Sequence, residues 1–198
     1  MRPSALRSRA CCVISLLLLT GSAGAQQARP PAQGQAGRTL QWFPIPADAT
    51  YVTGDTWTGA GSTFRLYGVQ ACLRGTQFTN GQGSRIDCGE ASLTMLASLV
   101  RDLAPQCYVV SSRPEARSHI VSCVAVLSRG ASSGSRLDLG TTLIATGWAF
   151  AALTVDAKPV HEPYLVAQVV AQKSRRGLWQ FNDVPDPSIA ILKAMRKR

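Results

Sequence analysis

The sequence has few residues of the kinds that bind transition metals or cradle a phosphate. Its two histidines, His119 and His161, lie far apart, and none of its six cysteines forms a CxxC pair. Zinc ligands usually come in closely spaced pairs, so zinc binding is excluded as the main use of the cysteines. No strand-to-helix GxGxxG pattern is present either, and the glycines at 81 and 83, beside Asn80, suit a loop.

The chain also lacks an apolar run long enough to span a bilayer comfortably. Its first 25 residues have a basic start with three arginines, an apolar centre at 11–19 and a small-residue ending at 23–25. This layout predicts a secretory signal peptide that is cleaved after Ala25, with a membrane anchor as the alternative. We therefore expect an exported protein, either periplasmic or secreted.

Acidic residues are scarce, because the sequence has 11 Asp and Glu against 21 Lys and Arg. Loss of the three arginines in residues 1–25 leaves 18 basic and 11 acidic residues, a net charge of +7. A surface of this charge attracts polyanions such as nucleic acid, acidic polysaccharide or anionic lipid headgroups. The alternative is a solvated basic surface without a specific partner.

Four cysteines remain after residue 25: Cys72, Cys88, Cys107 and Cys123. An even number in an exported chain predicts two disulfides, for which three connectivities exist. The spacing favours the local pairs Cys72–Cys88 and Cys107–Cys123, which close loops of similar length. In the chain-entropy treatment, each such loop stabilises the fold by roughly 3 kcal/mol.

Composition divides the rest of the chain into three parts. Residues 26–40 are rich in Gln, Pro, Gly and Ala, which predicts a flexible leader. We expect the folded domain at 41–182. Residues 183–198 contain two prolines and a basic end, and we expect them to form a frayed tail.

Within the domain, alternating and β-branched patterns predict strands at 51–57, 62–69, 106–112 and 119–128. The last of these is apolar at nearly every position, which predicts a strand covered on both faces. Helical periodicity predicts a helix at 88–103 and two more helices that end at Gly147 and Gly177. This set predicts a β-barrel plus helices (α+β), a five-stranded OB-fold Greek-key barrel with about three helices.

Six short blocks follow one another in a distinctive order. They are GDTW at 54–57, FRLYGV at 64–69, CGEA at 88–91, VSC at 121–123, LDLGTTLIATGWA at 137–149 and YLVAQVVAQKSRRGLW at 164–179. In this order the chain resembles the staphylococcal-nuclease-like (thermonuclease) family over about residues 50–180. The resemblance implies an OB-fold barrel with three helices, and it implies calcium-dependent hydrolysis of DNA and RNA phosphodiesters.

The resemblance carries over the metal positions only in part. Asp55 matches the first calcium-binding aspartate, but Gln70 replaces the second metal carboxylate and is a weak ligand. Leu73 replaces the glutamate that handles the attacking water. Calcium usually takes several hard oxygen ligands with carboxylates among them, and loss of a general base alone typically lowers a rate by ~10²–10⁴-fold. We therefore expect calcium to bind weakly or not at all.

The phosphate-binding positions are also changed. Arg65 matches the first phosphate-binding arginine of the family. Ser118 stands where the second arginine belongs, and Arg117 is displaced from it by one residue, which in a strand turns the side chain to the opposite face. Arg117 is therefore a weak candidate, and loss of a charge-stabilising donor typically lowers the rate by a further ~10²–10³-fold.

These residues predict a pseudoenzyme, an exported monomer that binds nucleic acid or another polyanion without cutting it. A second hypothesis is a weakly active, rewired nuclease in which Asp87 or Glu115 joins Asp55. A third is an envelope module that binds a protein partner. In the simplest reading, Asp55 is only a turn residue and Arg65 only a surface charge on a strand.

Overall fold

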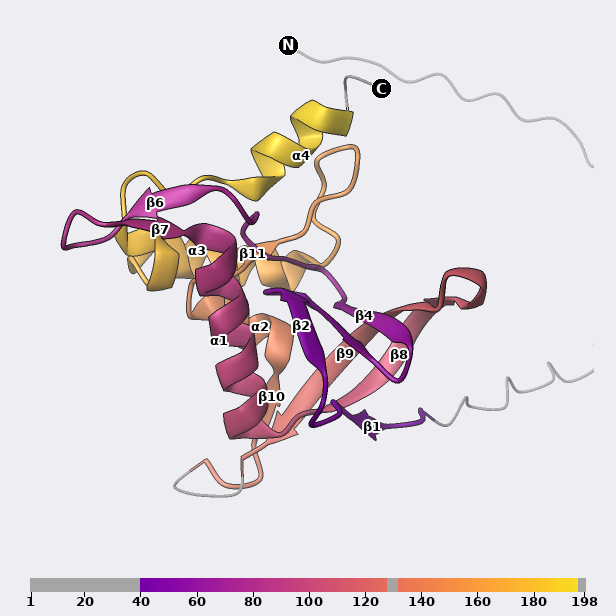
Figure 1. Ribbon diagram of the computed structural model, residues 1–198. Coiled ribbons are helices and arrows are strands. Elements are labelled where there is room, and N and C mark those ends of the chain that lie inside the picture. Colours follow the sequence, from indigo (N-terminus) through magenta and orange to yellow (C-terminus); the bar gives the residue numbers. More distant parts are fainter. Residues whose placement is uncertain (1–39, 128–131, 196–198) are drawn as a thin grey trace, which may run out of the picture. The chain divides into compact units, whose positions relative to one another are not determined.

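A seven-stranded sheet forms the body of the computed structural model, which describes residues 40–127 and 132–195. The predicted signal peptide and nearly all of the predicted leader lie outside the described residues. The strands of the sheet are β1 (Phe43–Pro44), β2 (Thr50–Thr53), β3 (Thr56–Gly59), β4 (Ser62–Leu66), β8 (Gln106–Arg113), β9 (Ser118–Val126) and β10 (Arg136–Asp138). Six of them follow the order β1-β8-β9-β4-β3-β2 (Figure 1). The seventh strand, β10, pairs with the C-terminal end of β9 at residues 124–126.

The sheet is curled. Strands β1 and β2 stand at opposite ends of the strand order, yet only residues 45–49 separate them in the chain. A connection this short brings the two edges of the sheet close together. All pairings along the order are antiparallel except that between β4 and β9, which is parallel. The fold class is thus mixed α+β with a curled, half-barrel sheet, as predicted at this coarse level.

Two small sheets complete the strands. One pairs β5 (Val69–Gln70) with β11 (Phe150–Ala151), and the other is a hairpin of β6 (Gln77–Thr79) and β7 (Arg85–Asp87). In the region of the β6–β7 hairpin, the sequence patterns predict only the loop around Gly81 and Gly83. The loop at 80–84 is present, because the Asn80 side chain accepts hydrogen bonds from the backbone N–H groups of Gln82 and Ser84. Strands of three residues are too short to show an alternating pattern, so the flanking pair was missed.

The three predicted helices are present as α1 (Cys88–Leu103), α2 (Leu139–Ala145) and α3 (Glu162–Lys173), with 3₁₀ turns η1 (Pro114–Ala116) and η2 (Gly177–Gln180). Aspartates at 87 and 138 begin α1 and α2, and each side chain accepts a hydrogen bond from a backbone N–H of the first turn. Such caps satisfy groups that the helix itself leaves without a partner. Tyr164 of α3 packs on α2, donates its hydroxyl to Asp138 Oδ1 at 2.7 Å, and has its pKa raised by burial.

A fourth helix, α4 (Pro187–Met195), corrects the prediction of a frayed tail. Pro187 is buried and stands at the first position of the helix, where a missing N–H is tolerated. The Asp186 side chain accepts a hydrogen bond from Ser188 N at 2.8 Å, which caps the new helix. Pro187, one of the two prolines of the predicted tail, therefore marks a helix start.

Two buried clusters hold these elements together, and each contains one disulfide. The main cluster, with Trp57, Leu96 and Leu143 at its centre, includes Cys107 and Cys123, and the smaller one includes Cys72 and Cys88. The bonded pairs are Cys72–Cys88 and Cys107–Cys123, so the predicted connectivity is confirmed. Two disulfides are typical of a chain that folds in an oxidising compartment.

Strand β9 is covered on one face only, whereas its apolar sequence predicted a strand covered on both faces. Its burial alternates, with Val121, Cys123 and Ala125 buried in the core and the residues between them only partly covered. The apolar residues of the second face line two open hollows instead, Ile120 one of them and Val124 and Val126 the other. Among the helices that the structure describes, none is both long and apolar enough to cross a membrane.

Candidate functional site

The predicted metal aspartate lies in a tight turn between β2 and β3, formed by Gly54 and Asp55. This turn, here called the Asp55 turn, packs against α1. A Cβ atom on Gly54 would lie 2.2 Å from Ser92 Oγ and 2.7 Å from the Ser92 backbone carbonyl carbon. Only glycine permits this close approach. The sequence therefore brings a carboxylate into the interior at the start of β3.

Asp55 is only 3% exposed, and both of its oxygens are occupied. Oδ1 accepts hydrogen bonds from the hydroxyls of Thr53 at 2.5 Å and Thr56 at 2.9 Å. Oδ2 accepts from Arg65 Nε at 3.0 Å and from the Ala71 backbone N–H at 3.3 Å. A carboxylate oxygen has about two lone-pair sites, so these donors use the acceptor capacity of the group.

Arg65, on β4, forms the other half of a half-buried ion pair. Its Nη2 lies 3.0 Å from Asp55 Oδ2 and also donates to Gln70 Oε1 at 2.8 Å. Its side chain is 44% exposed, against 4% for that of Asp55, so one side of the guanidinium faces solvent. The Gln70 amide nitrogen donates to the Ala71 carbonyl. The hydrogen bonds to Asp55 and to Gln70 thus fix the orientation of the Arg65 guanidinium group.

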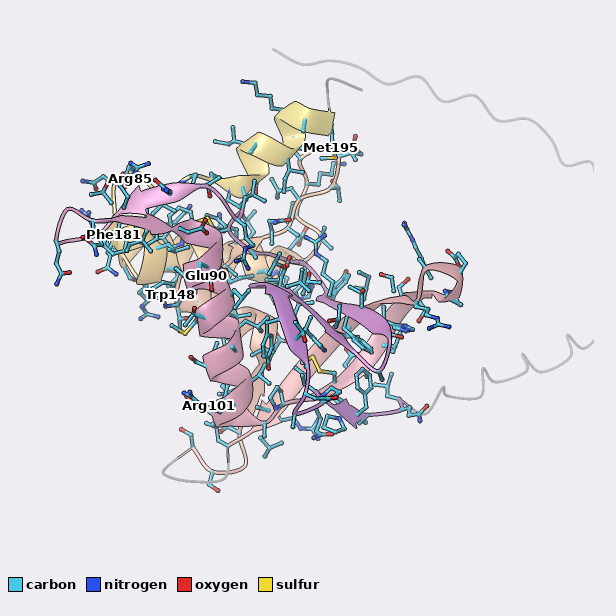
Figure 2. The ribbon with its side chains drawn as sticks, in the orientation of Figure 1. Arg85, Glu90, Arg101, Trp148, Phe181 and Met195 are labelled. Atoms are coloured by element: carbon cyan, nitrogen blue, oxygen red, sulfur yellow. A yellow bond between two sulfur atoms is a disulfide. The ribbon has the colours of Figure 1, made fainter. Side chains whose placement is uncertain are left out.

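The exposed side of Arg65 faces a hollow of ≈ 680 Å³ on the outer face of β4, β9 and β8. We call it the Arg65–Arg113 groove, after its two charged lining residues. The turn between β4 and β5, the loop after β11 and α4 form its other walls, and most of their lining side chains are apolar. Figure 2 labels Met195, which stands on α4 near this loop.

Arg113 is the second cation of the groove, and the sequence patterns did not find it. In the register of β8 and β9, Arg113 lies opposite Ser118, and Ser118 lies beside Thr63, two residues before Arg65 on β4. Arg113 and Arg65 therefore share the outer face of the sheet. Arg117, the predicted weak candidate, follows η1 in a left-handed conformation and lies near Gly61 in the β3–β4 turn instead.

A bulge in β8 explains the position of Arg113. Cys107 lies opposite Cys123 and Val109 opposite Val121, but beyond Val110 the register shifts by one residue. A bulge turns every following side chain to the other face of the sheet. Without it, Arg113 would lie on the core side of β8. The strand pattern alone contained no signal for this extra residue.

The residues of the site do not fit calcium. The acceptor sites of Asp55 and the Gln70 carbonyl are already used by donors of the protein itself. Over residues 40–127 and 132–195, no three His, Cys, Asp or Glu residues cluster closely enough to hold a metal ion. Calcium prefers six to eight oxygen ligands with carboxylates among them. We therefore derive no catalytic step through a metal.

The other carboxylates considered for a rewired site have structural positions. Asp87 caps α1 and accepts backbone N–H bonds from Glu90 at 2.9 Å and Gly75 at 2.7 Å, and these bonds, Glu90 first, lower its pKa. Glu115 is exposed in η1. Neither lines the groove, and Leu73 belongs to a turn closed by Thr76. The described part of the groove thus has two cations and no carboxylate at its surface.

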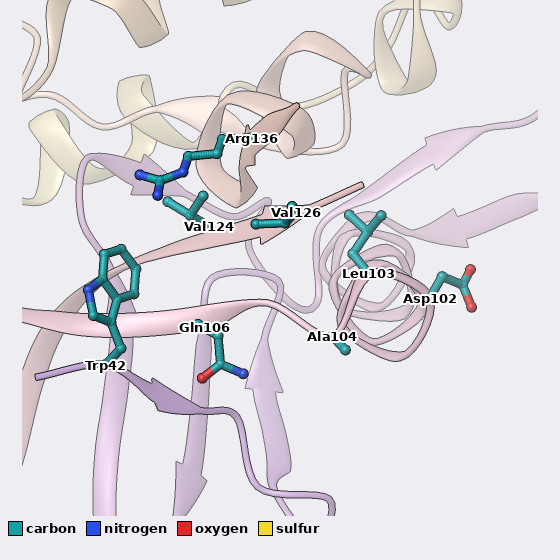
Figure 3. A pocket seen from close by; sticks show the side chains of 8 residues that line it. All are labelled: Trp42, Asp102, Leu103, Ala104, Gln106, Val124, Val126 and Arg136. Atoms are coloured by element: carbon teal, nitrogen blue, oxygen red, sulfur yellow. The ribbon is translucent and has the colours of Figure 1, made fainter. Parts of the chain in front are cut away.

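A second hollow, of ≈ 490 Å³, lies between the end of α1, the start of β8 and the end of β9 (Figure 3). Trp42, Leu103 and Val126 give it an apolar lining, with Arg136 as its basic residue. Its acidic residue, Asp102, pairs with the neighbouring Arg101 at 2.8 Å. The two hollows share no lining residue, so this one is separate from the Arg65–Arg113 groove.

Neither protein-family models nor curated proteins give a match to this chain. The resemblance to thermonucleases therefore stays a prediction that depends on the six sequence blocks.

Proposed function

We propose that the protein is an exported, thermonuclease-like OB-fold protein that binds nucleic acid or another polyanion in the Arg65–Arg113 groove without cleaving it. The observation that carries this proposal is a groove lined by two exposed arginines, Arg65 and Arg113, in which Arg65 pairs with a carboxylate, that of Asp55, whose acceptor sites are filled. Binding needs the arginines, whereas hydrolysis needs a metal carboxylate or a base as well.

The connectivity supports the finer fold assignment. Three consecutive antiparallel strands, β2, β3 and β4, are followed by α1 and then by the antiparallel pair β8 and β9, which returns to lie beside β4. Together with β1, which pairs with β8, this strand order supports the assignment to a partly open five-stranded Greek-key barrel. Barrels of this type often bind oligonucleotides, although a fold by itself does not determine a function.

Charge supports a polyanion as the ligand. Two guanidinium groups on one face, without a carboxylate at the groove surface, favour phosphate or sulfate oxygens, which guanidinium binds through paired hydrogen bonds. Asp55 lowers the local net charge but is screened from an incoming anion by Arg65 itself. The basic balance of the chain adds long-range attraction for the same class of partner.

Binding and cleavage of labelled single-stranded DNA by the chain from residue 26 onward test this proposal. We expect binding that is equal in calcium and in chelator, with no cleavage. Arg113→Ala should weaken binding and lower the slope of log affinity against log salt by about 0.7–1, the share of one phosphate contact. Arg117→Ala is the matched control, because it removes the same charge outside the groove.

Two outcomes would contradict the proposal. Calcium-dependent cleavage that Asp55→Asn abolishes would show that the site is an active, rewired nuclease. An equal loss of affinity in the Arg113 and Arg117 variants would show that the net charge of the chain, rather than the groove, attracts the polyanion.

A further inference from the structure

One wall of the Arg65–Arg113 groove is a later segment of the same chain, helix α4. Ile191 and Met195 of α4 lie four residues apart, and therefore on one side of the helix, and both line the groove. Val110, Ile120 and Val155, which line other walls, are also apolar. Helix α4 thus forms an apolar wall of the groove.

Helix α4 itself is weakly attached. Pro187 is its only buried residue, Ile189 is 69% exposed and Met195 is 37% exposed. Among the described residues, no side chain of α4 forms an ion pair or hydrogen bond with the rest of the domain. A helix with so few buried contacts belongs to the parts of a structure that open most easily.

The chain just before α4 is fixed, by contrast, to the β6–β7 hairpin. Phe181 stacks on Phe78 with ring centres 4.7 Å apart, and Asp183 accepts hydrogen bonds from Thr79 N at 2.9 Å and Thr79 Oγ1 at 2.7 Å. Figure 2 shows Arg85 and Phe181 near this hairpin and Met195 at the far end of α4. Residues 184–186 therefore connect a fixed root to a helix with few contacts.

We propose that α4 is an intramolecular lid that narrows the Arg65–Arg113 groove, and that a polyanion displaces it in order to contact both arginines at once. This inference rests on the proposed function, because the lid competes with the polyanion bound there. A phosphate placed against Ile191 and Met195 would lose water without gaining a donor, which opposes binding while α4 is in place. The apparent affinity is then the intrinsic affinity multiplied by the fraction of molecules with α4 displaced.

The chain offers a matched pair of variants on the same helix. Ile191→Ser removes an apolar side chain that lines the groove, and Ile189→Ser makes the same change at a position that faces solvent. Both substitutions change helix propensity by the same amount, so any difference between them reports the contact with the groove. A chain that ends at Asp186 removes the lid entirely.

The experiment measures the anisotropy of a labelled (dT)20 oligonucleotide and the hydrogen exchange of residues 187–195, with and without the oligonucleotide. Ile191→Ser should bind about fivefold more tightly than Ile189→Ser, since loss of one partly buried apolar side chain favours the open form by roughly that factor. The chain ending at Asp186 should bind at least as tightly. In the wild type, adding the oligonucleotide should speed exchange in α4.

The outcomes separate the two proposals. Oligonucleotide binding that is unchanged in Ile191→Ser and in the shortened chain, with exchange in α4 unaffected, overturns the lid and leaves the proposed function standing. Failure of every variant to bind the oligonucleotide overturns both. Circular dichroism of each variant confirms that the domain is folded before the comparison is made.

Discussion

The two sides of the Arg65–Arg113 groove are built by different forces. On one side, the Asp55 turn is buried, and four donors from three segments of the chain converge on one carboxylate. On the other side, α4 has one buried residue and contacts the groove through apolar side chains that stay partly exposed. Buried, fully satisfied polar networks are rigid, whereas a half-exposed apolar contact is easily broken.

This difference shows which part of the groove has a fixed geometry. Arg65 is oriented by Asp55 and Gln70, so an anion meets a cation that is already in position. The donors to Asp55 and Gln70 all come from residues 53–71, whereas α4 follows a root at Asp183 that is attached to the β6–β7 hairpin. Three substitutions test this contrast between the buried Asp55 turn and the weakly attached α4, and the one with the largest expected effect comes first.

Asp55→Ala should lower the free energy of unfolding by about 3 kcal/mol, the lower end of the cost of removing one partner from a buried ion pair. The lower end applies because the side chain of Arg65 is 44% exposed and can still be solvated. Urea denaturation measures the change. Asp102→Ala is the control, since Asp102 is exposed and pairs with its neighbour Arg101, and it should leave the free energy of unfolding nearly unchanged. Equal effects of the two substitutions would show that the Asp55 turn is not a rigid support.

Gly54→Ala should cost about 2 kcal/mol, because overpacking a well-filled site typically costs 1–3 kcal/mol. The added methyl group would displace Ser92, whose hydroxyl donates to the Trp148 carbonyl at 2.6 Å. Gly81→Ala is the matched control, since no atom lies within 4 Å of the added methyl group there. Thermal unfolding of the two variants compares them, and a Gly54→Ala protein as stable as Gly81→Ala would show that the turn can shift away from α1.

Asp183→Asn should have the smallest effect, and the effect should depend on pH. The backbone and hydroxyl of Thr79, with Arg85 nearby, hold the pKa of Asp183 below its ordinary value of 3.8. A lowered carboxyl pKa means that the stabilisation is fully present above pH 3.8 and is lost as the pH falls through the lower folded-state value. We expect a melting temperature lowered by about 1–2 °C at pH 6, as for an exposed ion pair, and no difference at pH 2. A difference that persists at pH 2 would assign the effect to the hydrogen-bond geometry of Asn instead of to charge.

Much of the fold could be predicted from local patterns. The helix at 88–103 was located to the residue, because Asp87 caps it and leucines recur at helical spacing. The disulfide pairs followed from spacing alone. The patterns failed for the β6–β7 hairpin, whose strands are too short to alternate, and for α4, where a frayed basic tail was expected.

The candidate site could also be predicted only in part. Sequence reasoning identified Asp55, Arg65 and Gln70, and the structure brings these three into direct contact. It did not show that Asp55 is buried, with donors on both oxygens. The hydroxyls of Thr53 and Thr56 are local donors, but Arg65 and the Ala71 N–H reach the carboxylate only when three segments of the chain meet.

By itself, the sequence determined the first three helices and the two disulfides, because these depend on residues near one another in the chain. The tertiary structure alone decided which arginine accompanies Arg65. One extra residue at Val110 shifts the register of β8 against β9, so that Arg113 reaches the outer face while Arg117 turns toward Gly61. Strand side chains alternate with a period of two, so a single inserted residue reverses the face of every residue that follows, and only the pairing of distant strands shows that the insertion is there.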